Sequence, residues 1–461
     1  MRIPYLSSGA AGVVLGLLLG AAPLRAEDNI VQLRAELDAI KAQYETRIQA
    51  LEQRLNVAEQ ALAATQQASQ PAVGPDLSPM AGAPALAGRS YASSGNEYNP
   101  SIGVILNGAY RSYENNPDKY EVPGVPQLGE AGQASDGFSI GESELIFAAN
   151  IDDWFYGRLT AAIEQEDDEF STSLEEAYVD TLSLPAGTTL RFGRFYSTVG
   201  YLNDKHPHSW DFSDQALPYV AFLDGQYGDD GIQFRWLAPT DFYLELGGEL
   251  FRGGSYPAAG DADNGTGAHS LFAKFGGDVG FSHSWAAGLS WLDAKARDRS
   301  DVGGDDPLSF DGDTDLYIAD FVWKWAPNGN VRQRNLIFQT EYLWRQQDGR
   351  YQGGGLASPQ SIDDDTSGWY AQLIYQWRPR WRTGVRIDGL NLDDPGLAFA
   401  GTPLEPLGDD PLRYTLMFDY SNSEFSRIRL QFERDETGLD NNSQLTLQYI
   451  MSLGAHGAHE F

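Results

Sequence analysis

One segment of the 461-residue sequence concentrates side chains that can bind a metal ion. His206-Pro-His208 lies between residues 197 and 229, with Asp204 and Asp211 beside it. Neutral imidazoles and carboxylates are ligands for Zn²⁺ and other transition ions. However, two histidines separated by a proline are a weak signal, and the spacing fixes no third ligand. The alternative is that both histidines are hydrogen-bonded loop residues without a metal.

A second group of charged residues can act on a passing solute rather than react with it. Residues 197–229 contain several aspartates. Further along the chain, a strip of arginines alternates with apolar residues. The two sets are Asp204, Asp211, Asp214 and Asp224, and Arg382, Arg386, Arg413, Arg427 and Arg429. On opposite walls of a pore they would create a transverse field, and an acidic ring would favour cations. The alternative is that the arginines neutralise carboxylates such as Asp388, Asp419 and Glu433.

Other kinds of chemistry find little support in the sequence. The chain has no Cys, which excludes disulfides, thiolate metal sites and Cys nucleophiles. It contains no phosphate-binding loop and no HExxH motif, so no enzyme and no cofactor are predicted, apart from a divalent cation at the histidines. With 65 Asp+Glu against 32 Lys+Arg, the net charge is −33. Such a surface repels phosphate, which excludes a nucleic-acid partner.

The elements that must position these residues are β-strands. Beyond the first residues, no apolar run approaches the 18 or so residues of a spanning helix. The 50 Gly and 12% aromatic residues, in a chain that is polar on average, are typical of a transmembrane β-barrel, whose strands alternate apolar and polar residues. Sixteen alternating segments are predicted near 101–113, 139–150, 154–164, 173–183, 188–196, 230–238, 241–252, 268–279, 283–294, 314–325, 334–346, 367–377, 380–390, 412–421, 424–434 and 444–461.

The connections between these segments alternate in length. Very short turns such as Asp152-Asp153, Pro239-Thr240 and Asn422-Ser423 follow every second segment. The connections between those turns are long and rich in Asp and Gly, including 114–138, 253–267, 295–313, 347–366 and 391–411. Short periplasmic turns and long outer loops are the asymmetry of an outer-membrane barrel. The acidic runs within the loops, such as Asp298–Asp306, Asp363–Asp365 and Asp409-Asp410, are read as solvated faces that can bridge divalent ions to lipopolysaccharide.

Two strands show which face meets lipid. In the last segment Leu445, Leu447, Tyr449, Met451 and Leu453 alternate with Gln444, Thr446, Gln448 and Ser452. The first set is expected to face lipid and the second a water-filled lumen. In the preceding segment Arg427, Arg429, Gln431 and Glu433 alternate in the same way with Ile428, Leu430 and Phe432.

The N-terminal part divides into three segments before the barrel at 98–461. Residues 1–26 have the apolar stretch and small-residue end of a secretory signal peptide. Residues 27–65 repeat apolar positions three or four apart with one stutter, which predicts a periplasmic coiled coil and hence self-association. The alternative is a single helix lying on its own barrel. Residues 66–97 are rich in Pro, Ala and Gly and form a linker.

A short motif resembles a known family. Leu174-Glu-Glu-Ala-Tyr-Val-Asp180, followed by Leu190-Arg-Phe-Gly-Arg-Phe195, is similar to the core of the phosphate-selective porin O/P family. The resemblance implies a sixteen-stranded outer-membrane barrel that assembles as a homotrimer. It also implies that the segment 197–229, the third long connection, folds into the barrel and narrows it. The alternative is a loop that caps the outer rim. The family's channels are lined by lysines and arginines, whereas this chain has six Lys, so phosphate selectivity is not carried over.

The leading hypothesis is therefore a porin in the outer membrane of a Gram-negative bacterium, with its N-terminal segment in the periplasm. Small hydrophilic solutes or ions would diffuse passively past the acidic loop and the arginine strip. The expected partners are membrane lipid, lipopolysaccharide and two further copies of the chain. One alternative is a metal-uptake protein that captures a zinc-like ion at His206 and His208. A second is a structural barrel tethered through its coiled coil.

Overall fold

The computed structural model describes residues 100–117, 120–125, 133–166, 169–260, 265–302, 307–406, 410–438 and 441–454. The predicted signal peptide, coiled coil and linker lie outside these residues. The described residues therefore all belong to the predicted barrel.

The described residues form a single antiparallel sheet of seventeen named strands. The strands are β1 (Ser101–Tyr113), β2 (Gly137–Ile140), β3 (Ser143–Asn150), β4 (Phe155–Glu166), β5 (Glu169–Thr181), β6 (Thr188–Tyr196), β7 (Gly228–Leu237), β8 (Tyr243–Phe251), β9 (Ala268–Val279), β10 (His283–Val302), β11 (Leu308–Trp325), β12 (Asn335–Gln352), β13 (Gln360–Arg378), β14 (Trp381–Asn391), β15 (Leu412–Ser423), β16 (Ser426–Glu436) and β17 (Asn442–Gly454).

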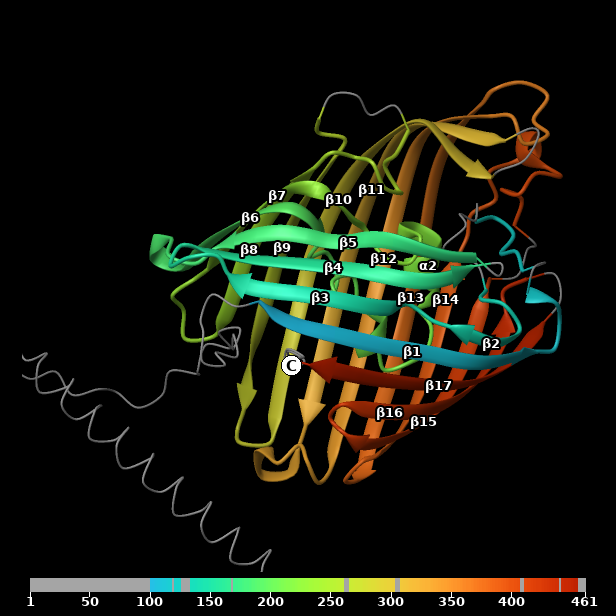
Figure 1. Ribbon diagram of the computed structural model, residues 1–461. Helices are drawn as coiled ribbons and strands as arrows, with labels where there is room; N and C mark the ends of the chain where they lie inside the picture. The colour runs from blue at the N-terminus through green and yellow to red at the C-terminus, as the bar shows by residue number, and fades with distance from the viewer. Residues whose placement is uncertain are drawn as a thin grey trace, which may run out of the picture. The chain divides into compact units, whose positions relative to one another are not determined.

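The sheet closes into a barrel (Figure 1). From β3 onward each strand pairs with its neighbours in sequence, and β17 pairs with β1. Both β2 and β3 pair with β1, so they occupy one position in the ring, interrupted at Gly141 and Glu142. Seventeen named strands therefore fill sixteen positions, which confirms the predicted sixteen-stranded antiparallel barrel.

Alternation of apolar and polar side chains determines the two faces of the barrel. On β17, Leu445 and Tyr449 are 45% and 44% exposed on the outside, whereas Thr446 and Gln448 are buried inside. On β16, Ile428, Leu430 and Phe432 face outward in the same way, and Arg429, Gln431 and Glu433 face inward. The predicted orientations of these two strands are confirmed. A ring with no free edge and an apolar exterior is a structure that can lie in a bilayer.

Two of the predicted long loops are instead extensions of strands. β10 extends to Val302 and β11 begins at Leu308. In the same way, β12 extends to Gln352 and β13 begins at Gln360. The predicted loops 295–313 and 347–366 are therefore wrong, and Asp363–Asp365 belong to β13 rather than to a loop. On β11 the outward residues Asp311 and Asp313 are polar and exposed, so this part of the strand lacks the apolar face of a lipid-facing strand. Its polar outer face is what made it resemble a loop.

The helical segments of the described residues are short. They comprise the α-helix α2 (Leu217–Leu223) and the 3₁₀ turns η3 (Pro185–Gly187), η4 (Pro207–Ser209), η5 (Pro327–Gly329) and η6 (Leu397–Phe399). In the part of the chain that the structure describes, no helix has the length and apolar character needed to cross a membrane.

Candidate functional site

The connection between β6 and β7, residues 197–227, lies inside the barrel and is called the inner loop below. Its backbone N–H groups bond to inward-facing side chains of every second strand from β8 to β12. Thr198 N donates to Glu249 Oε1 of β8 (2.9 Å), Gly200 N to Ser290 Oγ of β10 (3.2 Å) and Leu202 N to Glu341 Oε1 of β12 (3.2 Å). The inner loop thus follows the inner wall from its first residues.

The inner loop then crosses the lumen. Leu202 contacts β12, whereas His206 Nε2 lies 3.1 Å from Glu176 Oε2 of β5. Because β5 and β12 are seven positions apart in a ring of sixteen, they lie on nearly opposite walls. Four residues of chain therefore bridge the barrel interior, and Figure 1 shows α2 of the same loop within the ring of strands.

Asn203 holds the two ends of the inner loop together. Its side-chain amide donates to the carbonyl oxygens of Ser197 and Tyr227, both at 2.8 Å, and its oxygen accepts from Tyr227 N at 2.8 Å. These bonds satisfy backbone groups that burial removes from water. They also make a closed base from which the rest of the inner loop projects.

Apolar packing holds the inner loop against the wall. Tyr219, Phe222 and Leu223 of α2 are almost completely buried in a cluster that includes Leu316 of β11 and Leu343 of β12. Burying each such side chain contributes about 1.5–3 kcal/mol. The loop residues are therefore fixed in the lumen by the same effect that forms a protein core, and they do not form the alternative cap on the outer rim.

The structure brings the predicted arginines together with two of the predicted aspartates. Arg382 Nη1 lies 2.7 Å from Asp211 Oδ1, Arg386 pairs with Asp214, and Arg413 Nη2 lies 3.4 Å from Asp214 Oδ2. Arg427 and Arg429 both donate to the carbonyl oxygen of Trp210. This group, Arg382, Arg386, Arg413, Arg427 and Arg429, is called the arginine cluster below.

The other two predicted aspartates lie elsewhere in the inner loop. Asp204 lies 3.5 Å from Lys205 Nζ, and Asp224 ends α2 with a left-handed backbone at φ 51°.

The arginine cluster is paired with carboxylates on both the loop and the wall. Arg429 and Arg382 contact Asp419, and Arg413 contacts Asp388 at 2.6 Å. Burial alone would raise the pKa of Asp214, but Arg386 and Arg413 outweigh it and lower the pKa to about 2. Because each arginine lies directly against a carboxylate, the two sets of charges do not face each other across an open pore, as the predicted transverse field would require. The geometry favours the interpretation that the arginines neutralise carboxylates and anchor the inner loop.

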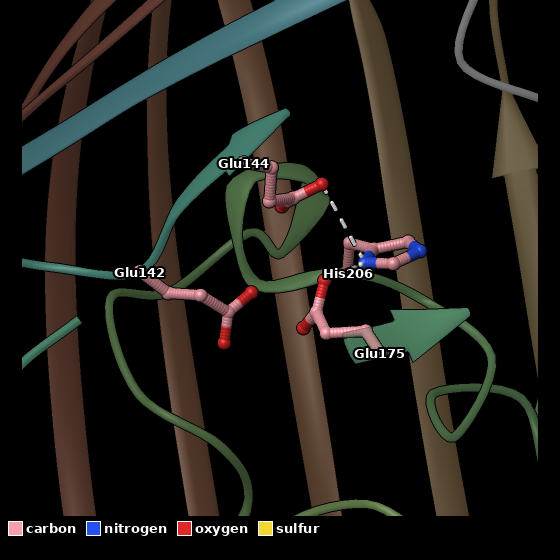
Figure 2. A group of neighbouring side chains, drawn as sticks. All are labelled: Glu142, Glu144, Glu175 and His206. Atoms are coloured by element: carbon pink, nitrogen blue, oxygen red, sulfur yellow. Dashed lines mark ion pairs between the residues drawn. The ribbon is translucent and has the colours of Figure 1, made fainter. Parts of the chain in front are cut away.

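On β3 and β5, His206 meets glutamates rather than the predicted Asp204 and Asp211. Its Nδ1 lies 3.4 Å from Glu175 Oε2 and 3.6 Å from Glu144 Oε2. Figure 2 shows these side chains and Glu142 turned toward one another. Glu142, Glu144, Glu175 and His206 are called the glutamate–histidine cluster below. His208 approaches it as well, because His208 Nδ1 contacts Glu144 Oε1.

Irregular strand geometry aims the glutamates inward. On β5, Leu174 pairs with Ala161 and Glu176 with Thr160, so Glu175 is an extra, bulged residue. In the β2–β3 position, residues 141–143 lie opposite only residues 106 and 107 of β1. A bulge re-aims side chains that strict alternation would send to opposite faces, and two of them here place Glu175 and Glu142 beside Glu176 and Glu144.

The electrostatics of the glutamate–histidine cluster are dominated by like charges. Burial alone would lower the pKa of His206, but Glu144, Glu175 and Glu176 outweigh it and raise that pKa well above its usual value. The cluster therefore accommodates positive charge.

The sequence motif that resembles the porin family supports this wall. Arg191 Nε lies 2.7 Å from Asp180 Oδ1 and the guanidinium stacks over the ring of Tyr178 at 3.7 Å. Gly193 has φ 125°, and a Cβ there would meet the carbonyl oxygen of Ala177 at 2.2 Å. The motif thus fixes β5 against β6. Its Glu175-Glu176 pair had no assigned role, although two successive charged residues in an alternating strand signal a bulge.

A cavity of about 1100 Å³ lies at the end of the barrel where the short turns are, and is called the vestibule below. Its lining includes the turn residues Phe281 and Phe425 and one side of the arginine cluster. Its charged lining residues are Lys324, Arg332, Arg380, Arg382 and Arg427, against Asp278 and Glu424. This mouth of the lumen is predominantly basic.

A Gly-x-Ser-x-Gly sequence occurs at residues 137–141. It lies on and just after β2, and Ser139 Oγ accepts a hydrogen bond of 2.9 Å from Arg111 on β1. The nucleophile elbow of hydrolases requires a sharp turn from a strand into a helix. This segment lies in a strand that continues the barrel, so it does not supply that geometry.

Comparisons with known proteins identify one protein of similar sequence and several solved structures of similar fold. No protein-family model matches the chain, and membership of the phosphate-selective porin O/P family remains a prediction. An uncharacterized protein of Aquifex aeolicus is 32% identical over 362 residues, which cover 75% of this chain and 74% of that protein. The solved structure of OprB from Pseudomonas putida aligns with a TM-score of 0.51 and 12% identity over 77% of this chain and 94% of that chain. An anion-selective porin from Comamonas acidovorans aligns with a TM-score of 0.48 and 10% identity over 77% and 99% of the two chains. The similarity to OprB shows the barrel fold.

Proposed function

We propose that this chain, which belongs to the same family as the Aquifex aeolicus protein, is an outer-membrane porin for small hydrophilic solutes or ions. The observation that carries the proposal is the closed ring of strands with an apolar exterior and a polar interior. Closure satisfies the backbone of every strand, so the ring can lie in lipid, while inward polar side chains can be hydrated. Passage through such a barrel is passive and needs no cofactor.

The inner loop is proposed as the constriction. It crosses from β12 to β5 and then pairs with β14, β15 and β16 through the arginine cluster. Solutes must pass the space that this loop leaves free, so its position sets the size limit. The homotrimer, which the family resemblance implies, and the tethering role of the coiled coil both remain predictions.

The experiment for passive diffusion is swelling of proteoliposomes in isotonic sugars of increasing size. We expect swelling with small sugars that slows steeply as the sugar grows, because the inner loop narrows the lumen. The proposal would be contradicted if vesicles with the purified, folded chain did not swell in even the smallest sugar.

The basic vestibule is proposed to raise the local concentration of anions at this mouth. Arg332 and Arg380 are exposed and line the vestibule. We expect Arg332→Gln combined with Arg380→Gln to move the reversal potential in a KCl gradient toward the cation side. Arg334→Gln is the matched control, because Arg334 is also exposed on the turn before β12 but does not line the vestibule. Equal shifts in both variants would mean that the vestibule does not act on ions.

A further inference from the structure

The glutamate–histidine cluster contains buried polar atoms that make no hydrogen bond. Glu142 Oε1, Glu144 Oε2, Glu175 Oε2 and His206 Nδ1 are all buried without a hydrogen-bond partner. Glu144 and His206 are 1% and 8% exposed. A buried polar atom without a partner is costly. Here one such atom comes from each of four neighbouring residues, and a ligand atom from each lies within 4.8 Å of those of the others.

Three of the four side chains are oriented through their other polar atom. His206 Nε2 lies 3.1 Å from Glu176 Oε2, which Arg158 Nε contacts at 3.1 Å. Tyr196 donates its hydroxyl to Glu175 Oε1 at 3.0 Å, and His208 contacts Glu144 Oε1. A histidine that binds a metal through one nitrogen commonly donates the other N–H to a carboxylate. The cluster shows that outer arrangement, while its inward-facing atoms make no hydrogen bond.

The spacing of the inward atoms suits a small divalent ion. His206 Nδ1 lies 3.4 Å from Glu175 Oε2 and 3.6 Å from Glu144 Oε2. A tetrahedral ion with ligand bonds of about 2.0–2.1 Å spaces its ligand atoms by roughly 3.4 Å. These two separations match edges of such a coordination shell, and all four ligand atoms lie within 4.8 Å of one another.

The charge of the cluster leads to the same conclusion. Glu142, Glu144, Glu175 and Glu176 bring four carboxyl groups together, and Arg158 pairs with Glu176. Carboxylates that are buried close to one another repel strongly unless they are protonated or neutralised by a cation. A divalent ion at the centre would offset most of the remaining charge.

We propose that Glu142, Glu144, Glu175 and His206 form a binding site for a divalent transition-metal ion of the zinc class. One imidazole with three carboxylates is a ligand set for Zn²⁺, Co²⁺ or Mn²⁺ rather than for Ca²⁺, which prefers oxygen ligands alone. The site joins β3 and β5 of the wall to the inner loop through His206. Its existence does not depend on transport, and its test is independent of conductance.

The test is titration of the purified, detergent-solubilised full chain with Zn²⁺ by calorimetry, and with Co²⁺ followed by its visible absorption. We expect one Zn²⁺ per chain with an affinity unaffected by excess Mg²⁺ or Ca²⁺, and displacement of bound Co²⁺ by Zn²⁺. Glu175→Gln and His206→Gln are each expected to weaken Zn²⁺ binding about tenfold or more. Glu142→Gln is expected to weaken it similarly, and because Glu142 lies at the break between β2 and β3, this variant preserves the barrel strands.

The matched control is the double variant His269→Gln, His283→Gln, which removes imidazoles outside the cluster and is expected to bind Zn²⁺ as the unchanged chain does. Folding of every variant is checked by its heat-dependent migration on gels. Absence of Zn²⁺ binding by the folded chain would overturn the proposal. Equal binding by the unchanged chain and by folded Glu142→Gln and His206→Gln would also overturn it, because the bound ion would then be adventitious.

Discussion

Replacing residues 200–226 of the inner loop by a short flexible linker is expected to raise the single-channel conductance several-fold. Within these residues, the backbone of Gly200 and Leu202 contacts β10 and β12, and the loop then crosses the lumen to β5 at His206. Without it, the cross-section is set by the sixteen-stranded wall, and the sugar size limit rises as well. Planar-bilayer recordings of the purified variant measure the change.

The barrel is expected to remain folded in this variant. Inward-facing groups such as Glu341 and Asp388 lose their loop partners, but water fills the widened lumen and hydrates them. Replacing residues 355–359, which connect β12 and β13 and are largely exposed, is the control and should leave the conductance nearly unchanged. Equal conductance of the inner-loop variant and the unchanged chain would show that the inner loop is not the constriction.

Replacing Arg413 by Met is expected to lower the free energy of unfolding by about 3–5 kcal/mol, because it leaves buried charges without their partner. Arg413 Nη2 lies 2.6 Å from Asp388 Oδ2 and donates to the carbonyl oxygen of Gln215 at 2.6 Å. Asp388 is 0% exposed. The substitution therefore removes a wall ion pair and an anchor of the inner loop together. Urea unfolding in lipid vesicles, followed by tryptophan fluorescence, measures the loss.

Arg434→Gln is the matched control for this substitution. Arg434 is partly exposed and pairs with the exposed Glu114 and Glu436 at 3.4 and 3.5 Å, so its loss should cost no more than about 1 kcal/mol. Adding Asp388→Asn to Arg413→Met should restore part of the stability, since the uncompensated carboxylate is then removed. Equal stability of the Arg413 and Arg434 variants would contradict the account of the arginine cluster.

The barrel could be predicted from the sequence because each membrane strand repeats a two-residue pattern. Leu445 to Leu453 on β17 and Ile428 to Phe432 on β16 show that pattern, and both strands have the predicted orientation. The ends of β10 to β13 next to the connections that follow Val302 and Gln352 could not be recognised as strands. Outward residues there, such as Asp311 and Asp363, are polar. Apolar alternation identifies the strand segments that face lipid, and it does not identify their polar continuations.

The candidate site could be predicted only in part. The alternation on β14 to β16 placed the arginines inside, and the segment containing Asp211 and Asp214 was recognised as unusual. The partners of His206 were not recognised, because Glu142 and Glu175 point inward only through bulges. Strict alternation sends Glu175 and Glu176 to opposite faces. The pairing of loop and wall also depends on a chain path that spacing in the sequence does not encode.

The central claim is that this barrel conducts through a water-filled lumen narrowed by the inner loop. The most direct test is single-channel current through the purified chain in a planar bilayer, with the reversal potential read across a KCl gradient. The account predicts stepwise openings of uniform size at low voltage. A folded chain that inserts into the bilayer and carries no current would contradict the porin proposal and favour the structural or metal-binding alternatives.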